Sequence, residues 1–199
     1  MRHIKFYISV FFLTFTLSVY AQVDTIQVQS IAMSKSIKNV VITPDSYDTN
    51  TAFPVVYLLH GAGGNYSSWV KGVPQLQQYA NDHQMIIVCP DGGRTSWYWD
   101  SPIDEKMKYE TYVSQELVKK IDEDYSTIAS PKGRAITGLS MGGHGALFLA
   151  IKHQDVYGAA GSQSGGVDIR PFPNSWDMAE RLGEFSEFPE NWEKNTVIN

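Results

Sequence analysis

Two short, uninterrupted apolar runs constrain the fold of this chain more than any other feature. The first, VVYLLH at residues 55–60, leads into the glycine-rich stretch GAGGN, and the second, MIIVC at residues 85–89, ends at Pro90. Strands buried on both faces of a sheet read as continuous apolar runs, whereas strands with one face in water alternate. Apolar residues at helical spacing lie between the runs, from Trp69 to Tyr79. The sequence therefore predicts a βαβ unit.

The same alternation continues along the chain. Residues 109–125 carry apolar positions at helical spacing beside a charged outer face, and residues 146–152 predict a second helix. Further strands are predicted at residues 36–43, 134–137 and 158–163. Residues 167–199 show no period, so we expect irregular structure or short helices there. This order predicts an α/β fold with an open, mostly parallel, doubly wound sheet and helices on both faces.

The first 21 residues have the pattern of a secretory signal peptide. A short basic region and an apolar run precede small residues at Val19 and Ala21, where a signal peptidase could cleave. A membrane anchor is the alternative, but serines and threonines interrupt the run, which is shorter than the ~20 apolar residues of a spanning helix. We expect a secreted or periplasmic protein without a stable membrane anchor, and one domain at residues 22–199.

The composition and motif spacing argue against a nucleic-acid partner and against a metal site. The net charge is −5 and no cluster of Lys and Arg is present, which argues against a nucleic-acid partner. The single cysteine, Cys89, lies in an apolar run and is expected to be a buried core residue. No HExxH, paired-cysteine or clustered His/Asp spacing indicates a metal site. We expect neither a metal nor another cofactor.

The strongest chemical signal is the sequence GLSMG at residues 138–142, between a predicted strand and a predicted helix. A serine on such a sharp strand-to-helix turn has a strained backbone and an exposed hydroxyl, which makes Ser140 a candidate nucleophile. Gly138 and Gly142 fit this interpretation because larger side chains would clash across the turn. An ordinary glycine-rich turn is the alternative.

A second motif, HGAGG at residues 60–64, follows the first buried strand. In hydrolases with a serine on this kind of turn, such a loop supplies one backbone N–H to the oxyanion hole, and the residue after the nucleophile supplies the other. The donors here would be Ala62 and Met141, with Gly61 allowing close approach and His60 bracing the loop. A phosphate cradle is the alternative, but the stretch lacks P-loop and GxGxxG spacing.

A general base for the serine is not evident. Hydrolases of this kind order their triad as serine, acid, histidine, and only His144 and His153 follow Ser140. A helix would point His144 away from the serine, and we expect His153 to lie in solvent at the helix end. Glu110 is either a buried anchor for a loop or a solvated residue.

An aromatic run, Trp97-Tyr98-Trp99, follows the second buried strand, where ligands collect in open α/β sheets. A flat aromatic wall there could stack on a sugar or a phenolic acyl group. Packing of the loop against the core is the alternative, and the sequence alone leaves both open.

Taken together, the stretches from residue 55 to residue 166 resemble the putative esterase family of α/β-hydrolases. This family includes feruloyl and acetylxylan esterases, S-formylglutathione hydrolases and the antigen 85 acyltransferases. The resemblance implies Ser140 as nucleophile and Ala62 and Met141 as oxyanion donors. It also implies that the acid and the histidine lie further along, so the chain is expected to lack the C-terminal strands and helix of the fold and to leave an open sheet edge.

These observations predict a secreted serine carboxylic-ester hydrolase without a cofactor. It would form an acyl-enzyme with small acyl or sugar-linked esters, of the acetyl or feruloyl type. One alternative is an acyltransferase that uses the same serine. Another is a non-catalytic remnant of a hydrolase that binds carbohydrate on the three aromatic side chains of residues 97–99.

Overall fold

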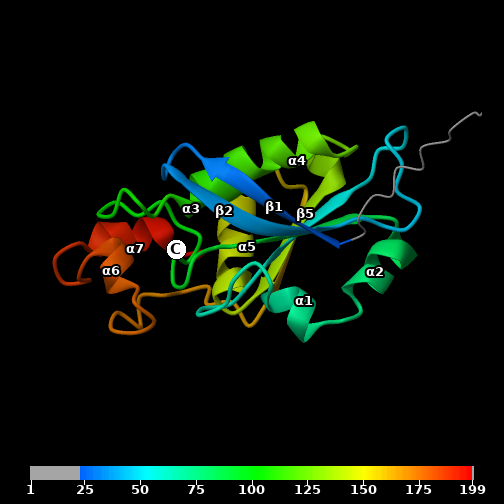
Figure 1. Ribbon diagram of the computed structural model, residues 1–199. Coiled ribbons are helices and arrows are strands. Elements are labelled where there is room, and N and C mark those ends of the chain that lie inside the picture. Colours follow the sequence, from blue (N-terminus) through cyan, green and yellow to red (C-terminus); the bar gives the residue numbers. More distant parts are fainter. Residues whose placement is uncertain (1–22, 199) are drawn as a thin grey trace, which may run out of the picture.

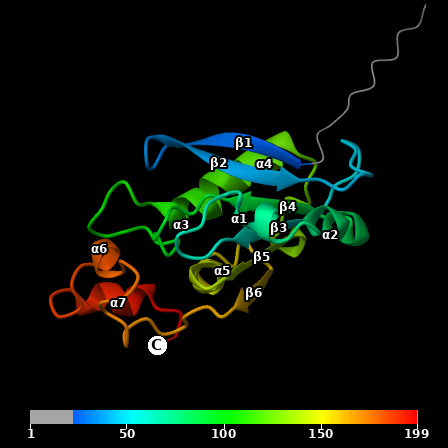
Figure 2. The ribbon, with the colours of Figure 1, turned by 60° about the horizontal axis from the view of Figure 1, so that its bottom comes forward.

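The computed structural model describes residues 23–198, so the expected signal peptide lies outside the described residues. Six strands form one sheet in the order β1-β2-β4-β3-β5-β6. Figure 1 shows the whole ribbon, and each strand of the sheet is labelled in Figure 2. The strands are β1 (Val23–Ser30), β2 (Lys35–Ile42), β3 (Val55–Leu59), β4 (Ile86–Pro90), β5 (Arg134–Leu139) and β6 (Ala159–Gln163). Strands β4, β3, β5 and β6 run parallel to one another, while β2 is antiparallel to both β1 and β4. The predicted mostly parallel sheet is confirmed.

Helices cover both faces of this sheet. They are α1 (Ser68–Gly72), α2 (Leu76–His83), α3 (Tyr109–Thr111), the π-helical segment η1 (Tyr112–Leu117), α4 (Val118–Asp124), the 3₁₀ turn η2 (Pro131–Gly133), α5 (Met141–Lys152), α6 (Ala179–Leu182) and α7 (Pro189–Asn195). On one face, Leu58 and Ile87 pack in a cluster with Leu76 and Ala80 of α2, and Cys89 is buried there as expected. On the other face, the larger core cluster joins the sheet to η1, α4 and α5.

Four elements differ from the sequence prediction, and one of them is α5, which begins at Met141 and not at residue 146. The strand β1 was not predicted, although its alternating burial is that of a strand with one face in water. The helix predicted from Trp69 to Tyr79 is two helices, because Pro74 has no N–H to continue a helix and Val73 before it leaves the helical conformation, with φ −132° and ψ 82°. The helix predicted at residues 109–125 is continuous but includes the π-helical turn η1.

The carboxyl ends of the four parallel strands point to the same edge of the sheet, so the loops after β3, β4, β5 and β6 meet there. The segment after β6 leads to α6 and α7, which lie at one end of the molecule, far from α2 at the other end (Figure 2). Strand β6 is outermost in the sheet order and is largely exposed. Among residues 23–198, no helix has the length and apolar character needed to cross a membrane.

Candidate active site

The turn at Ser140 is the most constrained point of the backbone. Ser140 has φ 55° and ψ −116°, a conformation that residues with a Cβ rarely adopt, and it immediately precedes α5. Its side chain is exposed, and its own N–H donates to the carbonyl of Gln163 at 2.8 Å. A Cβ at Gly142 would lie 2.3 Å from the carbonyl oxygen of Leu59, and one at Gly138 would lie 2.5 Å from the backbone of Gly142. The turn therefore requires glycine at both positions.

The loop after β3 lies directly against this turn. A Cβ built on Gly61 would be 3.5 Å from the Cβ of Ser140. Met141 is the first residue of α5, so no carbonyl of the helix accepts its N–H. Within residues 23–198, the N–H of Ala62 has no acceptor either. Two donors without acceptors thus lie on the two segments that meet at the Ser140 side chain, beside the positive end of the α5 dipole.

His60 braces this loop through both ring nitrogens. Its Nε2 accepts a hydrogen bond from the N–H of Gly92 at 2.9 Å, and its Nδ1 donates to the carbonyl of Gly61 at 2.8 Å. Burial lowers the pKa of His60, so the ring is neutral near pH 7. The imidazole therefore joins the loop after β3 to the loop after β4, and no lone pair remains for a reacting group.

A cavity of about 190 Å³ opens beside Ser140. It is lined by Ala62, Trp97, Ser140, Ser164, Gly166, Asp168, Ile169, Phe172, Trp176 and Met178. The structure therefore brings the predicted nucleophile, one predicted oxyanion donor and one predicted aromatic residue to the same space. All of the remaining lining comes from the segment after β6, and this part of the site was not predicted from the sequence.

The three aromatic residues after β4 do not share one role. Only Trp97 lines the cavity, and Tyr98 and Trp99 are fully buried. The Tyr98 hydroxyl donates to the carbonyl of His60 at 3.1 Å, and the indole N–H of Trp99 donates to His144 Nε2 at 2.9 Å. Tyr98 and Trp99 therefore pack against the core, which was the alternative to an aromatic wall. The three side chains do not form an exposed platform.

The segment of residues 164–178 supplies the outer wall. Trp176 is 54% exposed, and its carbonyl accepts a hydrogen bond from the indole N–H of Trp97 at 3.2 Å. Its ring lies 5.8 Å from that of Phe172. Arg170 holds the Asp168 carboxylate through two hydrogen bonds of 2.7 and 2.9 Å, which lowers the pKa of Asp168. The sequence analysis identified no candidate site residue in this segment, because its sequence shows no period that could place it beside Ser140.

Neither histidine that follows Ser140 reaches its hydroxyl. His144 lies one turn into α5, is completely buried, and has both ring nitrogens bound to other groups. His153 was expected in solvent, and this expectation is wrong: its side chain is 18% exposed and its Nε2 lies 3.0 Å from Glu110 Oε1. Glu110, whose side chain is 13% exposed, also pairs with Lys152 at 2.9 Å. It is therefore an anchor rather than a solvated residue, but it holds the end of α5 and not a loop. Within residues 23–198, no group is placed as a base for Ser140.

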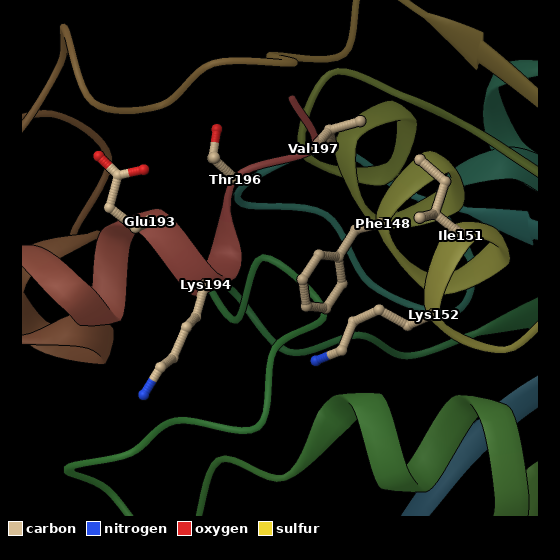
Figure 3. A pocket seen from close by; sticks show the side chains of 7 residues that line it. All are labelled: Phe148, Ile151, Lys152, Glu193, Lys194, Thr196 and Val197. Atoms are coloured by element: carbon tan, nitrogen blue, oxygen red, sulfur yellow. The ribbon is translucent and has the colours of Figure 1, made fainter. Parts of the chain in front are cut away.

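A second cavity, of about 200 Å³, lies between α5 and the end of α7 (Figure 3). The ring of Phe148 points into it, and Lys152 lies over that ring at 4.6 Å. None of its lining residues lines the Ser140 cavity. In the part of the chain that the structure describes, no group of three or more His, Cys, Asp or Glu side chains is arranged to bind a metal ion.

Comparison with known proteins extends these observations. A sequence profile for a family described as "Putative esterase" matches residues 30–197. A protein named as an esterase in Mycobacterium tuberculosis is 34% identical over 134 residues, which are 65% of this chain and 29% of that protein. A diacylglycerol acyltransferase/mycolyltransferase of Mycobacterium gordonae is 36% identical over 155 residues, which are 73% of this chain and 43% of that protein. The chain spans less than half the length of both relatives.

Solved structures are also similar. A ferulic acid esterase superposes with a TM-score of 0.70 at 28% identity, over 88% of this chain and 68% of its own. An S-formylglutathione hydrolase from Agrobacterium tumefaciens superposes with a TM-score of 0.74 at 20% identity, over 87% of this chain and 68% of its own. The second likeness concerns the fold alone.

Proposed function

This chain belongs to the putative esterase family, with the α/β-hydrolase fold expected from its sequence, and we propose that Ser140 is the nucleophile of a secreted serine carboxylic-ester hydrolase. One observation carries the proposal. The Ser140 hydroxyl is exposed at a strained turn, beside a cavity, and the N–H groups of Met141 and Ala62 lie on the two segments that meet there. Strain of this kind persists only where surrounding contacts enforce it, and it clusters at active sites.

The chemistry follows from this arrangement. Ser140 Oγ attacks the ester carbonyl, its proton passes to a general base, and the carbonyl oxygen becomes an oxyanion that accepts from the N–H groups of Ala62 and Met141. Collapse of this intermediate breaks the bond to the alcohol, which leaves with a proton. Water then releases the acyl group from Ser140 by the same steps. Each oxyanion donor contributes about 3 kcal/mol of transition-state stabilisation in such sites.

The base is the part of this mechanism that residues 23–198 do not supply. The rings of His144 and His153 are hydrogen-bonded to groups other than Ser140. The proposal therefore concerns the activity of the whole protein, whose solved relatives are longer than this chain. A hydrolase without its base keeps only about 10³- to 10⁴-fold acceleration over water, from the oxyanion hole and binding.

The substrate proposed is a neutral ester with a small acyl or a phenolic group. The lining of the Ser140 cavity is mainly aromatic and aliphatic, and its one carboxylate is already paired with Arg170. The similar ferulic acid esterase supports the phenolic choice. Hydrolysis of methyl ferulate and of an aryl acetate tests the proposal.

The matched variants for this test are two serines of the same cavity. In the whole protein, Ser140→Ala should reduce kcat by roughly 10⁶-fold, the loss seen when the nucleophile of a complete triad is removed. Ser164→Ala should keep the acyl-enzyme chemistry, because its hydroxyl is not on the turn before α5. Equal activity of the wild-type protein and the Ser140→Ala variant would show that another group carries the reaction.

Acyl transfer is a second candidate, favoured by the relative named as an acyltransferase/mycolyltransferase. The first half of the reaction is the same, and a sugar hydroxyl replaces water in the second half. The experiment adds a sugar alcohol during hydrolysis of the aryl acetate. Formation of the sugar ester faster than free acetate supports transfer, whereas unchanged release of acetate supports hydrolysis.

A further inference from the structure

One buried residue next to the proposed nucleophile has no part in the mechanism above. His144 lies four residues after Ser140 on the first turn of α5, and its N–H donates to the Ser140 carbonyl at 2.9 Å. Its imidazole is completely buried. Burying a histidine in the core is energetically unfavourable unless both of its ring nitrogens have hydrogen-bond partners.

The hydrogen bonds of His144 fix which nitrogen carries the proton. The indole N–H of Trp99 is only a donor, so the Nε2 of His144, at 2.9 Å, has to be the acceptor. The carbonyl of Gly166 is only an acceptor, so the Nδ1–H of His144, at 2.6 Å, has to be the donor. The ring is therefore neutral, with its proton on Nδ1. Burial also lowers the pKa of His144 to about 4, which keeps this form at neutral pH.

These two bonds join the two loops that form the sides of the Ser140 cavity. Gly166 lines the cavity from the segment after β6. Trp99 stacks on Trp97 with ring centroids 5.5 Å apart, and Trp97 lines the cavity from the loop after β4. The His144 ring also meets both indoles edge to face at 5.3 Å and stacks on Phe148 at 5.8 Å. No other described side chain hydrogen-bonds to both of these loops from the helix that follows Ser140.

We propose that His144 is a positioning residue: it binds the loop after β4 and the segment after β6 to the first turn of α5, and so holds the two walls of the cavity at a fixed distance from Ser140. It does not touch substrate and does not act as a base. The proposal rests on the proposed function for its kinetic consequence but not for the hydrogen bonds themselves.

Two variants and one control test this role. His144→Phe keeps a flat ring against Phe148 and removes both hydrogen bonds, whereas His144→Gln retains one donor and one acceptor. The control is His153→Gln at the other end of α5, whose partner is Glu110. All three proteins are first compared with the wild type by circular dichroism.

The kinetic arm uses hydrolysis of an aryl acetate. We expect His144→Phe to lower kcat/KM by about 100-fold, as for a misplacement of about 1 Å in an active site, with a clear rise in KM. His144→Gln should recover at least part of this loss, and His153→Gln should behave as the wild type. A loss caused only by a smaller folded fraction would lower the apparent kcat and leave KM unchanged, and that result would overturn the proposal.

The second arm does not depend on hydrolysis. In the wild-type protein, the Trp99 indole N–H should exchange slowly with solvent, and its NMR signal is identified by its loss in Trp99→Phe. His144→Phe should accelerate that exchange, and His144→Gln should restore protection. Unchanged protection in a folded His144→Phe protein would overturn the proposal. A wild-type protein that hydrolyses no ester would instead overturn the proposed function, and the exchange of Trp99 would still decide the role of His144.

Discussion

The turn at Ser140 is held by backbone segments that approach each other too closely to leave room for a side chain. A positive φ at a serine costs free energy, of order 1–3 kcal/mol, and the packing of α5 onto the end of β3 enforces it. That packing depends on Gly142, where a Cβ would meet the carbonyl oxygens of Leu59 and His60 at 2.3 and 2.8 Å. These neighbours are backbone atoms, so they have little freedom to move aside.

Gly142→Ala should therefore destabilise the protein by about 1–3 kcal/mol, the usual cost of an overpacked site. Urea unfolding measures this difference. The matched control is Gly72→Ala at the end of α1, where a Cβ would meet nothing within 4 Å. Alanine is the better helix former, so the control should be neutral or more stable by up to about 1 kcal/mol. Equal stability of the two variants would show that α5 does not pack onto β3 as described.

His144 should also give the protein a characteristic pH dependence. Its pKa is lowered from 6.5 to about 4 by burial, so between these pH values the unfolded chain binds more protons than the folded protein. Stability from this group is then fully present above pH 6.5 and is lost as the pH falls towards 4. The loss amounts to roughly 3 kcal/mol.

Urea unfolding between about pH 7 and about pH 4 tests this in the wild type and in His144→Gln. Other groups titrate in both proteins, so the difference between the two curves isolates His144. Towards the acid end, the free energy of unfolding of the wild type should fall by roughly 3 kcal/mol more than that of His144→Gln. Parallel curves would contradict a buried, neutral histidine at this position.

At the scale of elements, the end of α5 is fixed to α3 by one carboxylate. Glu110 is 13% exposed and accepts from Lys152 and from His153 at 2.9 and 3.0 Å. A surface pair within α4, Lys119 with Glu123, is far more exposed and has a separation of 3.8 Å. The Glu110 contact therefore joins two elements and is partly buried, whereas the Lys119–Glu123 contact lies within one helix and is solvated.

Glu110→Gln should destabilise the protein by about 1–2 kcal/mol, because it weakens two charge-assisted hydrogen bonds of which one faces solvent. Glu123→Gln should change the free energy of unfolding by less than about 0.5 kcal/mol. Thermal or urea unfolding gives both values. A loss at Glu123 as large as that at Glu110 would contradict the assigned anchor.

The elements also show what the sequence can and cannot predict. The apolar runs of β3 and β4 were identified because burial on both faces leaves a local pattern. The break at Pro74 was missed because the apolar spacing continues across it, and β1 was missed although its pattern alternates. The segment of residues 164–178 shows no period, since its side chains pack on residues of distant loops, such as Trp97, rather than on a repeating face.

At the scale of the whole molecule, the sheet collects four loops at one edge and so forms the candidate site. The motifs at residues 60–64 and 138–142 could be placed together from the sequence, because both follow parallel strands. The wall formed by residues 164–178 could not be placed from the sequence, because its position depends on how far the chain after β6 folds back over Trp97. The expectation that further strands and a catalytic histidine lie beyond this chain stays a prediction.

The central claim is that Ser140 is the reactive nucleophile, and covalent labelling tests it most directly. The whole protein is treated with a fluorophosphonate, digested and mapped by mass spectrometry. We expect one adduct, on the peptide that contains Ser140, retained in Ser164→Ala and absent from Ser140→Ala. An adduct on another serine, or none under conditions that label a known serine hydrolase, would contradict the account.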